Sequence, residues 1–200
     1  MKKFCSFFIV LGGFFVFGVQ TFANEAHVHG VTNMNVTVEG GKVEIELKSP
    51  LANFISFEHE PETDAQKKEV RAMGETLRKA DSLFLFPVEA GCKLEEVSLE
   101  SGVIDDHLLN ADASGHAPKT HGRHEGRGHA DHGHSGKDEH GHADIEVEVS
   151  FMCRNPEKLT KLQVNMFSAF PSLHEIEVQM LTPAEQKAAE LTPEANTITW

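Results

Sequence analysis

Two runs of alternating apolar and polar residues meet at Gly40-Gly41, and they constrain the fold more than any other feature. Apolar side chains occupy every second position of residues 34–38, and the same alternation resumes over residues 43–47. A period of two places one face of each run against a core and the other in solvent, and a Gly-Gly pair suits a tight turn. The pattern therefore predicts an antiparallel β-hairpin.

The rest of the chain indicates more strands and few helices. Thr63 and Gln66 have the spacing of a capping box, and apolar residues then recur at helical intervals, which predicts a helix over 64–80. A short helix is also predicted from Pro183 to Leu191. These elements indicate an α+β fold that is mainly antiparallel β-sheet with one or two helices. Further strands are predicted over residues 83–88, 94–100, 144–152, 161–167, 174–181 and 196–200.

Residues 1–23 have the three parts of a secretory signal peptide. Lys2 and Lys3 precede an uncharged apolar run, and small residues lie before an expected cleavage site after Ala23. An uncleaved membrane anchor is the alternative, but the run is short for a bilayer span of about 20 residues. We therefore expect export to the periplasm, with no permanent membrane anchor after cleavage.

Export sets the expected state of the cysteines. Of three Cys residues, Cys5 leaves with the signal peptide, whereas Cys92 and Cys153 remain. Two Cys in an oxidising compartment indicate a disulfide, which we expect to pin the base of the segment between them. A pair of soft metal ligands is the alternative, and it is disfavoured because exported thiols tend to be oxidised.

Residues 105–142 interrupt the strand pattern. After Leu109 no large apolar residue occurs until Ile145, so this segment cannot bury enough surface to offset the entropy of ordering it. We expect a flexible loop between a β-rich part at 24–104 and a second β-rich part at 143–200.

Histidine is concentrated in this predicted loop. The chain contains 13 His, and neutral imidazole is a good nitrogen ligand for Zn²⁺. So many ligands in a flexible chain can combine in many ways, so several exchangeable zinc sites per chain are expected. Their affinity should be modest because the loop must be ordered each time it binds an ion. Cu²⁺ and Ni²⁺ suit the same ligands. The predicted ligands of the loop are His116, His121, His124, His129, His132, His134, His140 and His142.

A second group of predicted ligands lies outside the loop. His27 and His29 stand two residues apart before the first strand, and Asp144 follows His142 at the same spacing, which favours binding of one ion by each pair. Glu58 and His59 precede the predicted helix, and His174 opens a late strand. An ordinary surface histidine is the alternative for His59 and for His174.

Charge and motifs argue against other classes of function. The formal net charge of −13 has the wrong sign for a nucleic-acid-binding protein. His124 and His129 approximate a zinc-protease motif, but that motif needs two His four residues apart on a helix, and two Gly residues intervene here. We therefore expect a metal-binding protein and no enzyme.

An ordered set of short motifs runs along the chain, with the His-rich segment before the last two. The motifs are His27-Val28-His29-Gly30, Ser49-Pro50, Phe57-Glu58-His59-Glu60-Pro61, Ala90-Gly91-Cys92, Phe151-Met152-Cys153 and Phe167-x-x-Phe170-Pro171. This set resembles the ZrgA family of periplasmic zinc-uptake proteins. The resemblance implies a Gram-negative periplasmic protein that binds zinc and cooperates with a zinc-importing ABC transporter and its substrate-binding protein. A periplasmic protein that buffers copper, nickel or zinc, or confers resistance to them, is the alternative.

Overall fold

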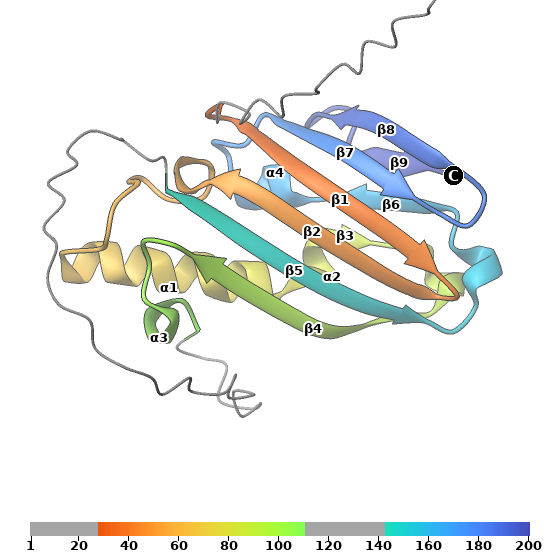
Figure 1. Cartoon of the computed structure of the whole chain (residues 1–200), viewed down its shortest axis with the longest axis horizontal. Coiled ribbons are helices and arrows are strands. Elements are labelled where there is room, and N and C mark those ends of the chain that lie inside the picture. The colour runs from red at the N-terminus through yellow and green to blue at the C-terminus, as the bar shows by residue number, and fades with distance from the viewer. Residues whose placement is uncertain (1–27, 111–142) are drawn as a thin grey trace, which may run out of the picture.

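The predicted hairpin lies at the centre of a six-stranded sheet. The computed structural model describes residues 28–110 and 143–200. Strand β1 (Val31–Glu39) pairs antiparallel with β2 (Lys42–Pro50) across the Gly40-Gly41 turn, as the alternation predicts. The other strands of this sheet are β4 (Cys92–Ser101), β5 (Asp144–Cys153), β7 (Glu175–Leu181) and β8 (Gln186–Leu191). The strand order is β4-β5-β2-β1-β7-β8, so strands from both sides of the His-rich segment form one sheet (Figure 1).

Three of the strands that flank the hairpin match the sequence predictions. They are β4 (Cys92–Ser101), β5 (Asp144–Cys153) and β7 (Glu175–Leu181). The pairing of β1 with β7 is parallel, and the other strand pairs of this sheet are antiparallel. An α+β fold dominated by antiparallel sheet is therefore confirmed.

The short helix predicted from Pro183 to Leu191 is wrong. Residues Gln186–Leu191 form strand β8, which pairs antiparallel with β7 at the edge of the sheet. Its Ala, Glu, Lys and Gln residues favour a helix, but ordinary residues differ in helix propensity by at most about 0.7 kcal/mol each. The hydrogen-bond ladder offered by β7 outweighs that preference.

A second layer covers the inner face of the sheet (Figure 1). Helix α1 (Asp64–Arg78) begins at the predicted capping box, in which the Thr63 hydroxyl accepts from the Gln66 backbone N–H and the Gln66 side chain accepts from the Thr63 N–H. Its buried residues join one hydrophobic core with the inward side chains of the sheet. Those helix residues are Val70, Met73 and Leu77.

The remaining elements are short. The strands predicted over 83–88, 161–167 and 196–200 are present in shorter form and make a three-stranded sheet, β3-β6-β9. No helix within 28–110 or 143–200 is long and apolar enough to span a membrane. The bounds are η1 Leu51–Asn53, α2 Ala80–Leu83, β3 Phe84–Leu85, η2 Val88–Ala90, α3 Asp106–Leu109, η3 Pro156–Lys158, β6 Lys161–Val164, α4 Met166–Ala169 and β9 Thr197–Thr199.

The predicted disulfide is present, but it does not pin the base of the His-rich segment. Cys92 begins β4 and Cys153 ends β5, and the two are directly opposite each other in the antiparallel ladder. The chain leaves β4 and returns to β5 at the other end of these ten-residue strands, about 30 Å away. The disulfide therefore fixes the far end of the β4–β5 pair, which we call the closed end.

The first part of the predicted loop is folded. Residues 106–109 form α3, whose Leu109 is buried, and the Arg78 guanidinium donates to the Leu109 carbonyl and to Asn110 Oδ1, both at 2.6 Å. These contacts attach α3 to α1. The rest of the predicted loop, residues 111–142, lies outside the described residues.

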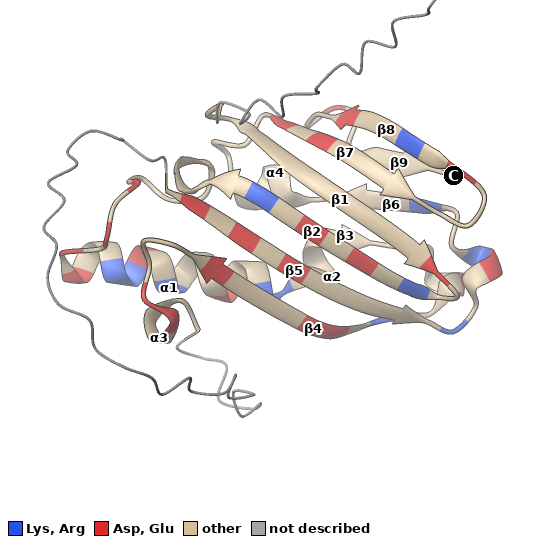
Figure 2. Cartoon of the chain, in the orientation of Figure 1, with Lys and Arg blue, Asp and Glu red and all other residues tan. Residues whose placement is uncertain are grey.

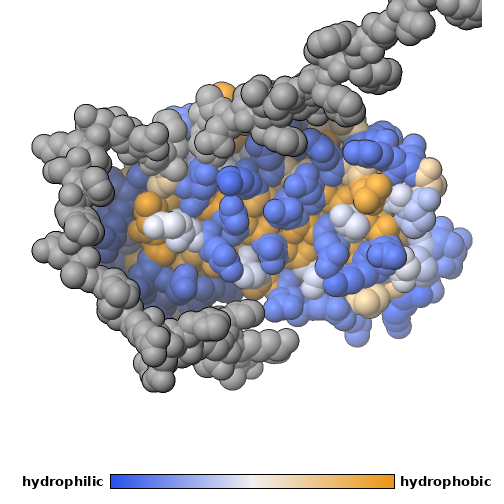
Figure 3. Space-filling view, in the orientation of Figure 1, coloured by the Kyte–Doolittle hydropathy of each residue, from blue (hydrophilic) through white to orange (hydrophobic). Residues whose placement is uncertain are grey.

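The outer face of the sheet is strongly acidic (Figure 2). Glu46 lies directly opposite Glu148, and Glu100 lies opposite Glu146. Hydrophilic side chains run in rows over this face (Figure 3), where Glu44, Glu46 and Glu148 help to line a shallow hollow. Like charges directly opposite each other weaken a sheet. The same negative charge attracts cations to this face.

Candidate functional site

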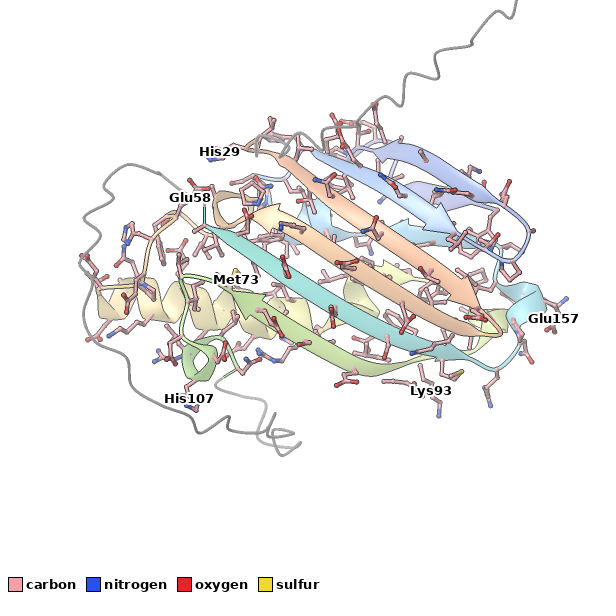
Figure 4. All side chains as sticks on the ribbon, viewed as in Figure 1. His29, Glu58, Met73, Lys93, His107 and Glu157 are labelled. Atoms are coloured by element: carbon pink, nitrogen blue, oxygen red, sulfur yellow. A yellow bond between two sulfur atoms is a disulfide. The ribbon has the colours of Figure 1, made fainter. Side chains whose placement is uncertain are left out.

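One end of the six-stranded sheet gathers most of the ligands that were predicted outside the loop. Strands β1, β5 and β7 begin there and β2 ends there, because Val31 is aligned with Glu175 and Pro50 with Asp144. His29 and Glu58 lie at this end of the sheet (Figure 4), Asp144 is the first residue of β5, and His174 directly precedes β7. We call this end of the sheet the histidine end.

Gly30 joins β1 to β7 at the histidine end. Its carbonyl accepts from the backbone N–H groups of His174 at 2.8 Å and Glu175 at 3.0 Å. Its φ is +88°, and a Cβ added there would lie 2.9 Å from Cδ2 of His174. Only glycine adopts this conformation readily and leaves room for the imidazole, which explains why Gly follows His29.

Asn53 joins β1 to the end of β2. Its Oδ1 accepts from the Gly30 N–H at 2.6 Å, and its Nδ2 donates to the Val31 carbonyl at 2.8 Å and to Ser49 Oγ at 2.9 Å. The residue is only 1% exposed. A buried amide with several partners holds its neighbours in one geometry, so Asn53 fixes the backbone next to His29.

The role of Asn53 was missed in the sequence analysis. One signal was available, because Asn53 stands in a stretch from Leu51 to Phe57 that is otherwise mostly apolar. A polar residue at such a place is usually buried with hydrogen-bond partners. Neither strand alternation nor ligand spacing draws attention to it.

His29 and Glu58 form the closest pair of predicted ligands. The distance from His29 Nε2 to Glu58 Oε1 is 3.2 Å, and the side chains are 59% and 24% exposed respectively. The Glu58 Oε1 atom itself is withdrawn from solvent. Figure 4 places both side chains at the end of the sheet where β1 begins. The carboxylate is therefore the sheltered member of the pair and the imidazole the accessible one.

The other predicted ligands near this end have different surroundings. His59 is exposed, its Nδ1 lies 2.8 Å from the Glu60 carbonyl oxygen, and its ring contacts Phe57 with centroids 5.2 Å apart. Asp144 is half-buried, and its Oδ1 atom is withdrawn from solvent. Within the described residues, no three His, Cys, Asp or Glu side chains already stand together as a group that could hold a metal ion.

Comparison with known families assigns the chain to one of them. The sequence model described as "ZrgA family zinc uptake protein" matches residues 26–200. The chain belongs to the ZrgA family. No curated protein matches the sequence. Family membership confirms the resemblance drawn from the motifs and associates the chain with zinc and with zinc uptake.

The matched residues 26–200 of this ZrgA-family protein include the histidine end and two further predicted ligands, His27 and His142. His27 lies two residues before His29, and His142 lies two residues before Asp144. These two His, like the seven other loop ligands from His116 to His140, lie outside the described residues. Their part in binding stays a prediction.

Proposed function

We propose that this ZrgA-family protein captures Zn²⁺ in the periplasm and assists its import by an ABC transporter. The observation that carries the proposal is the concentration of possible metal ligands at the histidine end of the sheet. His29 and Glu58 lie there (Figure 4), and Asp144 and His174 stand at the starts of β5 and β7. In the sequence, the His-rich segment ends directly before it. Imidazole with supplementary carboxylate is the ligand set that zinc prefers among these side chains.

Zinc is cargo in this proposal, and the protein has no catalytic step to perform. The His-rich segment supplies many alternative ligand sets, so it binds several ions with modest affinity and releases them readily. The acidic outer face adds attraction for cations over distances up to about 8 Å at physiological ionic strength. Both properties suit a protein that collects an ion and then gives it up.

The partner expected from this role is the periplasmic substrate-binding protein of the transporter. A ligand site that is open on one side allows a second protein to take the ion by exchange of ligands. Titration of zinc-loaded protein against the purified apo substrate-binding protein tests this directly. Transfer that is faster than spontaneous zinc release supports a handover, and transfer at the spontaneous rate contradicts it.

Zinc binding itself is tested by isothermal titration of the mature chain. More than one Zn²⁺ per chain is expected, and a variant with His→Gln at the eight loop positions from His116 to His142 should bind fewer ions. This variant keeps the length of the chain and leaves α3 intact. An unchanged stoichiometry would remove the loop from the proposal.

The role in import requires a separate test in cells. A strain that lacks the protein should grow poorly in chelated medium and recover when zinc is added. Full growth without the protein contradicts a role in import. Metal analysis of protein isolated from the periplasm without an affinity tag distinguishes zinc uptake from copper or nickel buffering, since the bound metal would then be copper or nickel.

A further inference from the structure

We propose that His29 and Glu58 are the anchored ligands of a discrete zinc site at the histidine end, separate from the sites of the His-rich segment. This site rests on the proposed function, because it takes the same ion. It goes further by assigning one position in the folded domain and two named ligand atoms, His29 Nε2 and Glu58 Oε1.

The separation of the two atoms suits a shared zinc ion. Zn–N bonds of about 2.0–2.1 Å and Zn–O bonds of about 2.0–2.2 Å, in a tetrahedron, place two ligand atoms about 3.3–3.4 Å apart. His29 Nε2 and Glu58 Oε1 are 3.2 Å apart. A zinc ion can therefore bind both atoms after movements of a few tenths of an ångström.

The backbones of both ligands are held in place independently. His29 precedes Gly30, which is hydrogen-bonded to Asn53 on one side and to β7 on the other. On the Glu58 side, Ser56 donates from its backbone N–H and its hydroxyl to the Glu69 carboxylate of α1, at 2.7 and 2.9 Å. Preorganised ligands lose less entropy when an ion binds, so the site differs in kind from a flexible loop.

The exposure of the pair suits an ion that must enter and leave. Glu58 presents an oxygen that is sheltered from water, whereas His29 is more than half exposed. Two protein ligands leave two positions of a tetrahedral ion for water or for exchanging ligands. The site is consequently open to the solvent side, as transfer of a cargo ion requires.

An ordinary histidine–glutamate ion pair is the competing explanation of the same distance. The two explanations differ in what happens when zinc is added. In a zinc site the His29 ring nitrogen binds the added metal, whereas in a simple ion pair it stays in contact with Glu58 and zinc leaves it unchanged.

The test is a zinc titration of the full mature chain followed by ¹⁵N NMR of the histidine rings. His29 is assigned with His29→Gln, and His59 with His59→Gln. At one equivalent of Zn²⁺ in the variant with eight His→Gln loop substitutions, the His29 ring resonances should move to metal-bound positions. Those of His59, the exposed neighbour of Glu58, should stay in place. Unmoved His29 resonances at saturating zinc would overturn the proposal.

A substitution of the carboxylate provides the second measurement. Glu58→Gln keeps the shape of the side chain but weakens the zinc ligand, so the dissociation constant measured at His29 should rise about tenfold or more. The matched control Glu60→Gln should leave it unchanged. Equal affinity in Glu58→Gln and in the parent would also overturn the site.

Failure of this site and failure of the proposed function give different results. Zinc bound only by the loop histidines, with normal zinc-dependent growth, would remove the site and leave the function. If zinc binds at His29 but deletion of the protein does not affect growth in chelated medium, the site stands and the role in import is contradicted.

Discussion

The two ends of the six-stranded sheet are stabilised in different ways. At the closed end, a covalent bond joins β4 to β5, and the Cys153 N–H donates to the Gly41 carbonyl at 2.8 Å. At the histidine end, hydrogen bonds from Asn53 and Gly30 join the strands. The covalent bond therefore lies away from the proposed ligands, and the end that carries them depends on a small polar network.

The largest effect is expected from breaking the closed end. Replacing both cysteines, Cys92→Ser with Cys153→Ser, opens a ring with a sequence separation of 61. The free energy of unfolding should fall by about 4 kcal/mol because the unfolded chain gains entropy, as measured by urea denaturation. Wild-type protein reduced with dithiothreitol should behave alike. While the variant is folded, zinc affinity at His29 should stay within about twofold, and a larger loss would show that the two ends are coupled.

Breaking the polar network at the histidine end should lower the free energy of unfolding somewhat less than removing the disulfide does. Asn53→Ala leaves the Gly30 N–H, the Val31 carbonyl and the Ser49 hydroxyl without this partner in a buried place. The free energy of unfolding should fall by about 3 kcal/mol. Unlike the cysteine variant, Asn53→Ala should also weaken zinc binding at His29, by roughly tenfold.

A surface asparagine provides the control for that experiment. Asn35 lies on the exposed face of β1, where its amide donates to Glu46 at 3.3 Å. Asn35→Ala should change the stability by no more than about 0.5 kcal/mol. If the two alanine variants are equally stable, the polar network does not hold the histidine end together.

Two glycines allow a matched comparison of the ends. A Cβ at Gly41 would lie 2.7 Å from the backbone oxygen of Cys153, whereas a Cβ at Gly30 would lie 2.9 Å from the side chain of His174. Both have positive φ, but an imidazole can rotate away and a strand carbonyl cannot. Gly41→Ala should therefore lower the free energy of unfolding by about 3 kcal/mol, and Gly30→Ala should lower it by about 1–2 kcal/mol.

Thermal or urea unfolding of the two alanine variants checks this difference. Gly102 is the control, because a Cβ there meets nothing within 4 Å and its φ is not in the positive range. Gly102→Ala should be close to neutral. Equal destabilisation at positions 30 and 41 would mean that the histidine end is as unyielding as the closed end.

The smallest effect is expected between the ends, on the acidic face. Glu148→Gln removes the repulsion with Glu46 directly opposite and should raise the free energy of unfolding by about 0.5 kcal/mol at low salt. The gain should disappear in 1 M salt, where the screening length is about 3 Å. Glu146→Gln should gain less, because Glu146 lies 3.3 Å from the Lys48 ammonium. Equal gains would indicate a general effect of net charge.

Local patterns predicted the parts of the fold that local physics determines. The hairpin at Gly40-Gly41 and the capped start of α1 at Thr63 follow from residues close in sequence, and both are confirmed. Strand β8 was mistaken for a helix because its residues favour a helix until β7 offers hydrogen bonds. The parallel pairing of β1 with β7 is a tertiary choice that no window of residues encodes.

The candidate site was predictable in its chemistry but not in its geometry. Histidine and carboxylate spacing identified His29 and Glu58 as possible ligands, yet they are 29 positions apart and nothing in the sequence pairs them. Their approach depends on the path of the chain between β2 and α1. Asn53 was overlooked because its importance comes from buried hydrogen bonds rather than from a motif.

The parallel pairing of β1 with β7 also has a kinetic consequence. Val31 is aligned with Glu175, so the central strand of the sheet finds one of its neighbours 144 positions later in the chain. Contacts over such separations slow folding, because a long loop must close before they form. The sheet cannot be completed, and Gly30 cannot be positioned beside His174, until β7 and the residues before it are present. A chain that stops before β7 therefore lacks a finished histidine end.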